Sequence, residues 1–112
     1  MPIDSASAGV DTARIRLVGE FDGANAGLLH DEVLALLSRI RLSRIVVDMH
    51  LVTLADSTAL GTLVSCHRAA AAAGAVLTIE APSPFVRRVL WVSGLQGLFG
   101  LAPPAVVASP RA

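Results

Sequence analysis

Lysine is absent from this sequence of 112 residues, and cysteine occurs once, as Cys66. A single cysteine excludes an intramolecular disulfide and is typical of a reducing compartment, so we expect a cytoplasmic protein. Without lysine there is no phosphate-binding G-x-x-x-x-G-K-[ST] loop, and neither G-x-S-x-G nor H-E-x-x-H occurs. The sequence therefore carries no standard motif for nucleotide hydrolysis, esterase or metalloprotease chemistry.

Net charge is also lacking, because nine arginines balance nine acidic residues. No basic run or stripe is present, so we expect no direct nucleic-acid binding. No apolar run approaches the ~20 residues of a membrane-spanning helix, so we expect no membrane insertion. The N-terminus shows no basic segment followed by an apolar one, so we expect no signal peptide.

Apolar residues, in contrast, are abundant: 54% of the chain is hydrophobic and 16% is charged. This balance and the length predict one domain with one core, spanning residues 1–112. We place the core at about 13–100. We expect segments 1–11 and 103–112, at the two ends of the chain, to be loosely ordered.

The hydrophobic pattern divides this core into alternating strands and helices. Polarity alternates over 13–20, which predicts a strand with one wet face, whereas 44–49 contains an unbroken apolar run typical of a central strand. In chain order we expect a strand at 13–20, a helix at 25–40, a strand at 44–49, a loop or short extended stretch at 51–55, a helix at 57–73, a strand at 76–80 and a helix from Pro84 to about Gly94. This alternation predicts an α/β fold with a largely parallel sheet.

The start of the helix at 57–73 is the feature with the most chemical potential. Asp56 is a typical N-cap residue, and Ser57 and Thr58 place two hydroxyls in the first turn. A phosphate there adds nearly two negative charges, which the free helix N–H groups tolerate and which Asp22 and Asp56 repel if the fold brings them close. Asp-Ser-Thr is also an ordinary capping sequence, so these three residues alone leave both interpretations open.

The wider sequence favours a phosphorylation switch over an ordinary capping sequence. Five short segments resemble, in order and spacing, the STAS family and in particular bacterial anti-sigma factor antagonists, over residues 13–99. The segments are Gly19-Glu20-Phe21-Asp22, Ile45-Val46-Val47-Asp48-Met49, Asp56-Ser57-Thr58-Ala59-Leu60-Gly61, Phe85-Val86-Arg87-Arg88-Val89-Leu90 and Gly94-Leu95. The chain departs from the family pattern at Ala59, where glycine is frequent, and at Thr58, where serine is usual.

The resemblance implies an α/β fold, a single STAS-like domain whose central, mostly parallel mixed β-sheet is packed by about four helices. It also implies a binding module and not an enzyme. Its partner would be an anti-sigma factor that is also a serine/threonine protein kinase, and binding would free a sigma factor for transcription in a stress response. Phosphorylation at Thr58, with Ser57 as the second choice, would break the complex, and a phosphatase would restore it. The implied partner-binding residues are Asp22, Asp56, Ser57, Thr58, Ala59 and Leu60.

The last expected helix carries a second candidate surface. Its expected inner stripe consists of Phe85, Val86, Val89 and Leu90. Trp91 lies nearly opposite that stripe, beside Arg87, and tryptophan and arginine are frequent anchors of protein interfaces. We predict a self-association or partner surface at Arg87 and Trp91, in a monomer or weak homodimer. The alternative is that Trp91 packs under residues 95–101.

Three other functions stay open from the sequence. The first is a soluble STAS subunit of a membrane transport complex of the ABC type, and the second is a STAS docking module that is never phosphorylated. The third is a small enzyme that uses Asp48 and Asp56 as an acid–base or metal pair. We expect no cofactor and no metal, because His30, His50 and His67 lie in different elements without ligand spacing.

Overall fold

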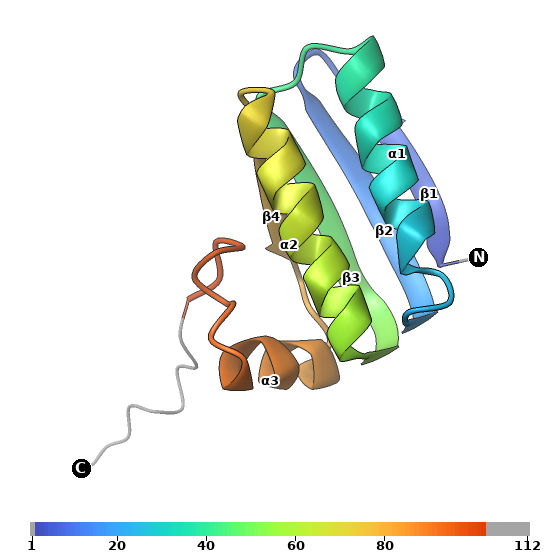
Figure 1. Ribbon diagram of the computed structural model, residues 1–112, viewed down its shortest axis with the longest axis vertical. Helices are drawn as coiled ribbons and strands as arrows, with labels where there is room; N and C mark the ends of the chain where they lie inside the picture. Colours follow the sequence, from blue (N-terminus) through green and yellow to red (C-terminus); the bar gives the residue numbers. More distant parts are fainter. Residues whose placement is uncertain (1, 103–112) are drawn as a thin grey trace.

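The computed structural model describes residues 2–102, which form one sheet and its covering helices (Figure 1). In chain order the elements are β1 (Ile3–Ala8), β2 (Thr12–Phe21), α1 (Ala26–Arg39), β3 (Arg44–Ala55), α2 (Ser57–Ala72), β4 (Val76–Glu80) and α3 (Pro84–Val92). The strands lie in sequence order, with β1 antiparallel to β2 and the pairs β2–β3 and β3–β4 parallel. The predicted α/β fold with a mostly parallel mixed sheet is confirmed. The described residues form three helices where about four were expected, and residues 96–100 form turns.

One face of the sheet is covered by α1 and α2, which lie side by side across it (Figure 1). Side chains from both layers meet there in one buried cluster. Its fully buried members include Ala13, Ile15 and Leu17 of β2, Leu29 and Val33 of α1, and Leu63, Cys66 and Ala70 of α2. Since burial of one large aliphatic side chain stabilises a fold by about 1.5–3 kcal/mol, this layer is the main source of stability.

The opposite face of β2 is wet, as its alternating sequence predicted, and ion pairs cross it. Arg14 pairs with Glu80 of β4 and so reaches over β3, where Val46 lies opposite Arg14 in the register and is only 6% exposed. Arg16 contacts Asp48 of β3 at 3.4 Å. The apolar run at the centre of β3 is therefore buried on both faces, by helices on one side and by the aliphatic stem of an arginine on the other.

Two strands depart from the sequence-based expectation. Residues 3–8, expected to be loosely ordered, form the edge strand β1, whose small polar side chains are mostly exposed and give no apolar alternation to recognise. β3 continues through residues 51–55, where a loop or short extended stretch was expected, and pairs with β2 as far as Phe21 and Ala55. Register shifts in this pairing break the strict period of two and hide the strand in the sequence. The expectation for 103–112 falls outside the described residues.

α3 lies at one end of the sheet, near the start of α2 (Figure 1). It begins as predicted, with Ser83 as N-cap and Pro84 in the first turn. Val86 and Leu90 are fully buried, but Phe85 is 44% exposed, so its place in the inner stripe was wrong. The chain then returns along β4, where the Phe99 carbonyl accepts a hydrogen bond from the Ile79 N–H at 3.1 Å. Within the described residues no helix is long and apolar enough to span a membrane.

Candidate functional site

The carboxylate of Asp56 joins two segments at the start of α2. Its Oδ1 accepts a hydrogen bond from the Ala59 N–H at 2.8 Å, which caps the helix as predicted. Its Oδ2 accepts from the Gly23 N–H at 3.0 Å, and Gly23 belongs to the loop between β2 and α1. One side chain therefore fixes this loop against the helix that carries Ser57 and Thr58.

The loop between β2 and α1 is also held by its own polar side chains. The Asp22 N–H donates to Asn25 Oδ1 at 2.9 Å, and the Ala24 N–H donates to Asp22 Oδ1 at 3.0 Å. Asn25 Nδ2 donates to the Glu20 carbonyl at 2.8 Å. These side-chain-to-backbone bonds are typical of tight turns. They satisfy backbone groups that have no partner strand once β2 has ended.

Thr58 lies against this loop. A Cβ built on Gly23 would stand 3.4 Å from Thr58 Cβ, in van der Waals contact, so the space between the two residues holds one methyl group. Ser57 and Thr58 are both exposed, Leu60 is half-buried and Ala59 is fully buried. The burial of Ala59 explains why a small residue stands where the STAS pattern has glycine.

The structure thus places the loop that carries Asp22 beside Asp56 and Thr58, and it adds two residues that the sequence analysis did not single out. Gly23 and Asn25 shape the loop and position it beside Thr58. Their signal in the sequence is a cluster of turn-forming residues after the strand, which marks a turn but does not reveal what the turn contacts.

The charged side chains of the β2–α1 loop and of the start of α2 are acidic, whereas Arg87 and Arg88 lie on the neighbouring helix α3. Backbone hydrogen bonds from Ala59 and Gly23 lower the pKa of Asp56 below its ordinary value. Glu20 and Asp22 belong to the same end of the sheet, and segments 17–38 and 45–67, which supply the site, contain no arginine. An added phosphate would therefore meet favourable helix N–H groups and unfavourable neighbouring carboxylates at once.

Asp48 and Asp56, the carboxylate pair of the enzyme hypothesis, do not lie close together. Asp48 points to the open sheet face, where Arg16 Nε lies 3.4 Å from its Oδ2 and the His50 N–H donates to its Oδ1 at 2.9 Å. β3 continues for seven residues after Asp48, so Asp56 lies roughly 20 Å farther along the strand. The two groups cannot share a substrate or a metal ion.

Cys66 and His67, neighbours on α2, both take part in packing. Burial raises the pKa of the Cys66 thiol to about 11, which keeps it protonated and unreactive. His67 packs edge-on against Phe99, with the ring centroids 5.8 Å apart. Among residues 2–102 no three histidine, cysteine or acidic side chains gather to hold a metal ion.

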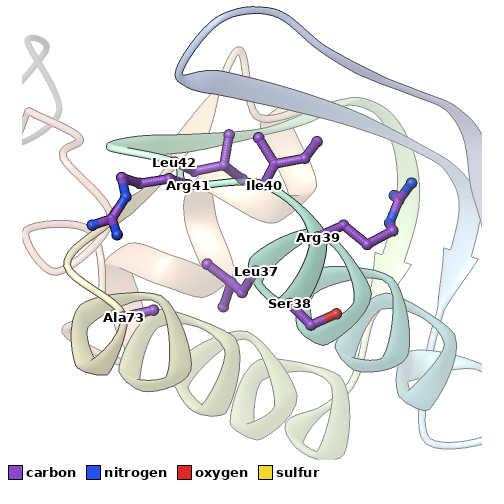
Figure 2. Close-up of a pocket in the computed structure, with 7 residues that line it drawn as sticks. All are labelled: Leu37, Ser38, Arg39, Ile40, Arg41, Leu42 and Ala73. Atoms are coloured by element: carbon purple, nitrogen blue, oxygen red, sulfur yellow. The ribbon is translucent and has the colours of Figure 1, made fainter.

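A hollow of about 310 Å³ lies at the other end of the helices (Figure 2). The stretch from Leu37 to Leu42 lines it together with Ala73, beyond the end of α2. α1 has 14 residues, so this hollow is about 20 Å from the loop that contacts Thr58. It belongs to a different part of the surface from the Asp56 site.

On α3, Trp91 keeps 43% of its surface exposed, and Arg87 is exposed as well. Trp91 therefore lies outside the buried stripe of Val86 and Leu90, as the helical spacing predicted. Its use as an interface stays a prediction.

Comparison with known proteins gives a consistent family and fold. A family model described as "Mlab, STAS domain" matches residues 5–103. A search of curated proteins finds no match. Among solved structures the chain is similar to the anti-sigma factor antagonist SpoIIAA in its unphosphorylated form, with 22% identity, 92% of this chain and 90% of that chain covered, and a TM-score of 0.75.

Two further proteins share the fold. An anti-sigma factor antagonist from Mycobacterium paratuberculosis is 20% identical, with 92% of this chain and 86% of that chain covered and a TM-score of 0.74. A sulfate transporter family protein from Wolinella succinogenes is 17% identical, with 84% and 75% covered and a TM-score of 0.66. SpoIIAA of Bacillus also matches in its phosphorylated form, at 21% identity, 92% and 94% coverage and a TM-score of 0.68. At these identities the likeness is one of fold.

Proposed function

Because the chain belongs to the STAS domain family, we propose that it is an anti-sigma factor antagonist that acts by partner switching. The observation that carries the proposal is the junction at Asp56, whose carboxylate binds the Gly23 and Ala59 N–H groups and so presents Thr58 beside a fixed loop. Two of the structures with this fold are named as anti-sigma factor antagonists, which supports the same role.

The proposed docking surface is formed by the loop and the first turn of α2. Its residues are Asp22, Asp56, Ser57, Thr58 and Leu60; Ala59, which the sequence analysis included, is fully buried and supports this surface from below. Ser57 and Thr58 offer exposed hydroxyls, and Asp56 adds negative charge, so the partner is expected to present donors or basic groups there. The proposed partner is an anti-sigma factor that is also a serine/threonine kinase, and the chain binds it in the cytoplasm without any catalytic step of its own.

The proposed switch is a phosphate on Thr58. A phosphate carries about −1.5 to −2 charges at neutral pH. The start of α2 tolerates that charge, so the fold of the domain changes little. A partner already seated on this surface faces added bulk and charge beside Asp56, and like-charge contacts in an interface cost several kcal/mol. Phosphorylation therefore breaks the complex, and a phosphatase resets it.

Intact-mass analysis with peptide mapping, after expression in the native host, tests the modification. We expect a phosphate increment on Thr58 that is absent from Thr58→Ala and kept in the matched variant Ser57→Ala. Affinity capture from the same cells tests the partner: Thr58→Ala should retain a kinase-type anti-sigma factor and Thr58→Glu should lose it. A wild-type protein free of phosphate in both growing and stressed cells would contradict the switch.

A second candidate is a docking subunit of a membrane transport complex. The observation that favours it is the shared fold with the Wolinella succinogenes protein, which is named as a sulfate transporter family member. In this case the same affinity capture would retain a transport ATPase in place of a kinase, and Thr58→Ala and Thr58→Glu would bind it alike. A STAS docking module that is never phosphorylated would also bind its partner equally well with Thr58→Ala and Thr58→Glu, whatever that partner is.

A further inference from the structure

Gly23 faces the side chain of Thr58 closely. A Cβ built on Gly23 would lie 3.4 Å from Thr58 Cβ, 3.4 Å from Cγ2 and 3.6 Å from Oγ1. The loop cannot easily retreat, because the Gly23 N–H donates to Asp56 Oδ2 and Asp56 caps the helix that carries Thr58. One carboxylate therefore holds both residues of this contact in place.

Backbone conformation does not explain why glycine stands at position 23. The glycines with positive φ are Gly19, Gly74, Gly94 and Gly100, and Gly23 is not one of them. A residue with a side chain would adopt the same backbone without strain. What glycine supplies at this position is room beside Thr58.

Room matters because threonine differs from serine by the methyl group Cγ2. Threonine in a helix divides between two χ1 rotamers, so its methyl and hydroxyl positions depend on what they contact. At Thr58 both Cγ2 and Oγ1 lie within 3.6 Å of the position that a Cβ on Gly23 would occupy. An alanine at 23 would already be in contact with all three side-chain atoms of Thr58, and a branched residue would reach its hydroxyl.

We propose that Gly23 is a specificity-determining residue of the Thr58 site. Its missing side chain accommodates the threonine methyl and leaves Oγ1 open to the active site of a protein kinase. This inference rests on the function proposed above and deepens it, because it makes residues 23 and 58 a pair. An alanine at 23 would meet Thr58 at ordinary van der Waals distance, whereas a branched residue would crowd the threonine methyl, which serine lacks.

The pairing is tested with Gly23→Val, Thr58→Ser and the double variant, beside the wild-type chain. The measurement is the initial rate of phosphate incorporation at residue 58 in a native-host lysate supplied with Mg²⁺ and ATP. Because a misplacement of about 1 Å costs an enzyme up to about 100-fold, we expect Gly23→Val to slow the reaction about 10- to 100-fold. The double variant should recover the rate of Thr58→Ser. Gly27→Val is the matched control, since a Cβ at Gly27 would meet nothing within 4 Å.

Equal rates for the wild type and Gly23→Val would overturn the pairing while leaving the switch intact. Absence of phosphate from the wild type would overturn the proposed function, and NMR then decides the pairing separately. Three-bond couplings to Cγ2 report the Thr58 χ1 angle. One rotamer in the wild type and in Gly27→Val, and a different or averaged one in Gly23→Val, supports the pairing. Identical couplings in all three proteins would overturn it.

Discussion

Asp56 accepts a hydrogen bond from the backbone N–H of Gly23, 33 residues earlier in the chain, at 3.0 Å. The same carboxylate caps α2 through the Ala59 N–H. The N-cap residue of α2 therefore has a second role, which is to hold the β2–α1 loop beside Thr58. The geometry of the candidate site depends on this one side chain.

The two roles of Asp56 can be separated by substitution. Asp56→Asn keeps an oxygen that can cap Ala59, but its amide nitrogen cannot accept from Gly23, whereas Asp56→Ala removes both bonds. We expect Asp56→Asn to raise hydrogen exchange at the Gly23 N–H with little loss of stability. Asp56→Ala should raise exchange at both amides and lower the free energy of unfolding, as measured by urea denaturation.

Asp56→Ser is a useful control, since the serine hydroxyl caps a helix but is too short to bond the N–H groups of both Gly23 and Ala59. It should resemble Asp56→Asn in exchange at Gly23. If Asp56→Ala left exchange at Gly23 unchanged, the loop would be held by Asp22 and Asn25 alone, and Asp56 would be only a cap.

Acid should weaken this junction. Backbone hydrogen bonds from Ala59 and Gly23 lower the pKa of Asp56 below its ordinary value of 3.8. A carboxyl whose pKa is lower in the folded than in the unfolded chain contributes stability above the unfolded-state pKa. That contribution is lost as the pH falls through the folded-state pKa. The stability difference between wild type and Asp56→Ala should therefore be largest near neutral pH and shrink below about pH 4.

The measurement is a series of urea denaturation curves of both proteins across this pH range. A difference that stayed constant down to about pH 2 would mean that the charge of Asp56 adds nothing to its hydrogen bonds. The same series recorded by hydrogen exchange at Gly23 would show whether the loop opens together with the cap.

How much of this site could be read from the sequence depends on the range of each interaction. Asp56, Ser57 and Thr58 are neighbours, so the cap and its hydroxyls are a local pattern and were predicted correctly as the start of a helix. Gly23 lies in the loop after β2 and Thr58 in the first turn of α2, after β3, and the parallel pairing of β2 and β3 brings the two together. Nothing in the local sequence encodes that contact.

The strands show the same limit. The apolar run of β3 is visible because both faces of a central strand are buried, and the alternation of β2 is visible because one face is wet. β1 is an edge strand that consists of serine and alanine over residues 5–8, and this part is specified by its pairing with β2 and not by its own side chains. Phe85 was assigned to the inner stripe by spacing alone, but α3 lies across the end of the sheet and buries only the face of Val86 and Leu90.

Phe99 should anchor the segment that follows α3. Its side chain is fully buried, its ring meets His67 edge-on, and its carbonyl bonds to the free edge of β4. Since large-to-small substitutions of buried aromatic residues cost about 3–5 kcal/mol, we expect Phe99→Ala to lose that much in urea denaturation. His67→Ala should cost less, about 0.5–1.5 kcal/mol from the ring contact.

Leu98→Ala is the matched control, because Leu98 precedes Phe99 in the chain and is 41% exposed. A loss of less than about 1 kcal/mol in Phe99→Ala, comparable with that of Leu98→Ala, would show that the segment is not part of the cooperative fold.

Trp91 and Arg87 form the surface for which we predict self-association or partner contact. They are four residues apart on α3 and therefore neighbours on one helix face, and both are exposed. Because interface energy concentrates in tryptophan and arginine, Trp91→Ala should lower the fraction of homodimer in sedimentation equilibrium, or the affinity for the captured partner, by about tenfold or more. Its stability should change little, since the side chain is 43% exposed. Arg68→Ala, an exposed arginine of α2, controls for lost charge. If Trp91→Ala and Arg87→Ala change neither mass in solution nor partner affinity while Thr58→Glu abolishes binding, docking is confined to the start of α2 and α3 serves only to close the end of the sheet.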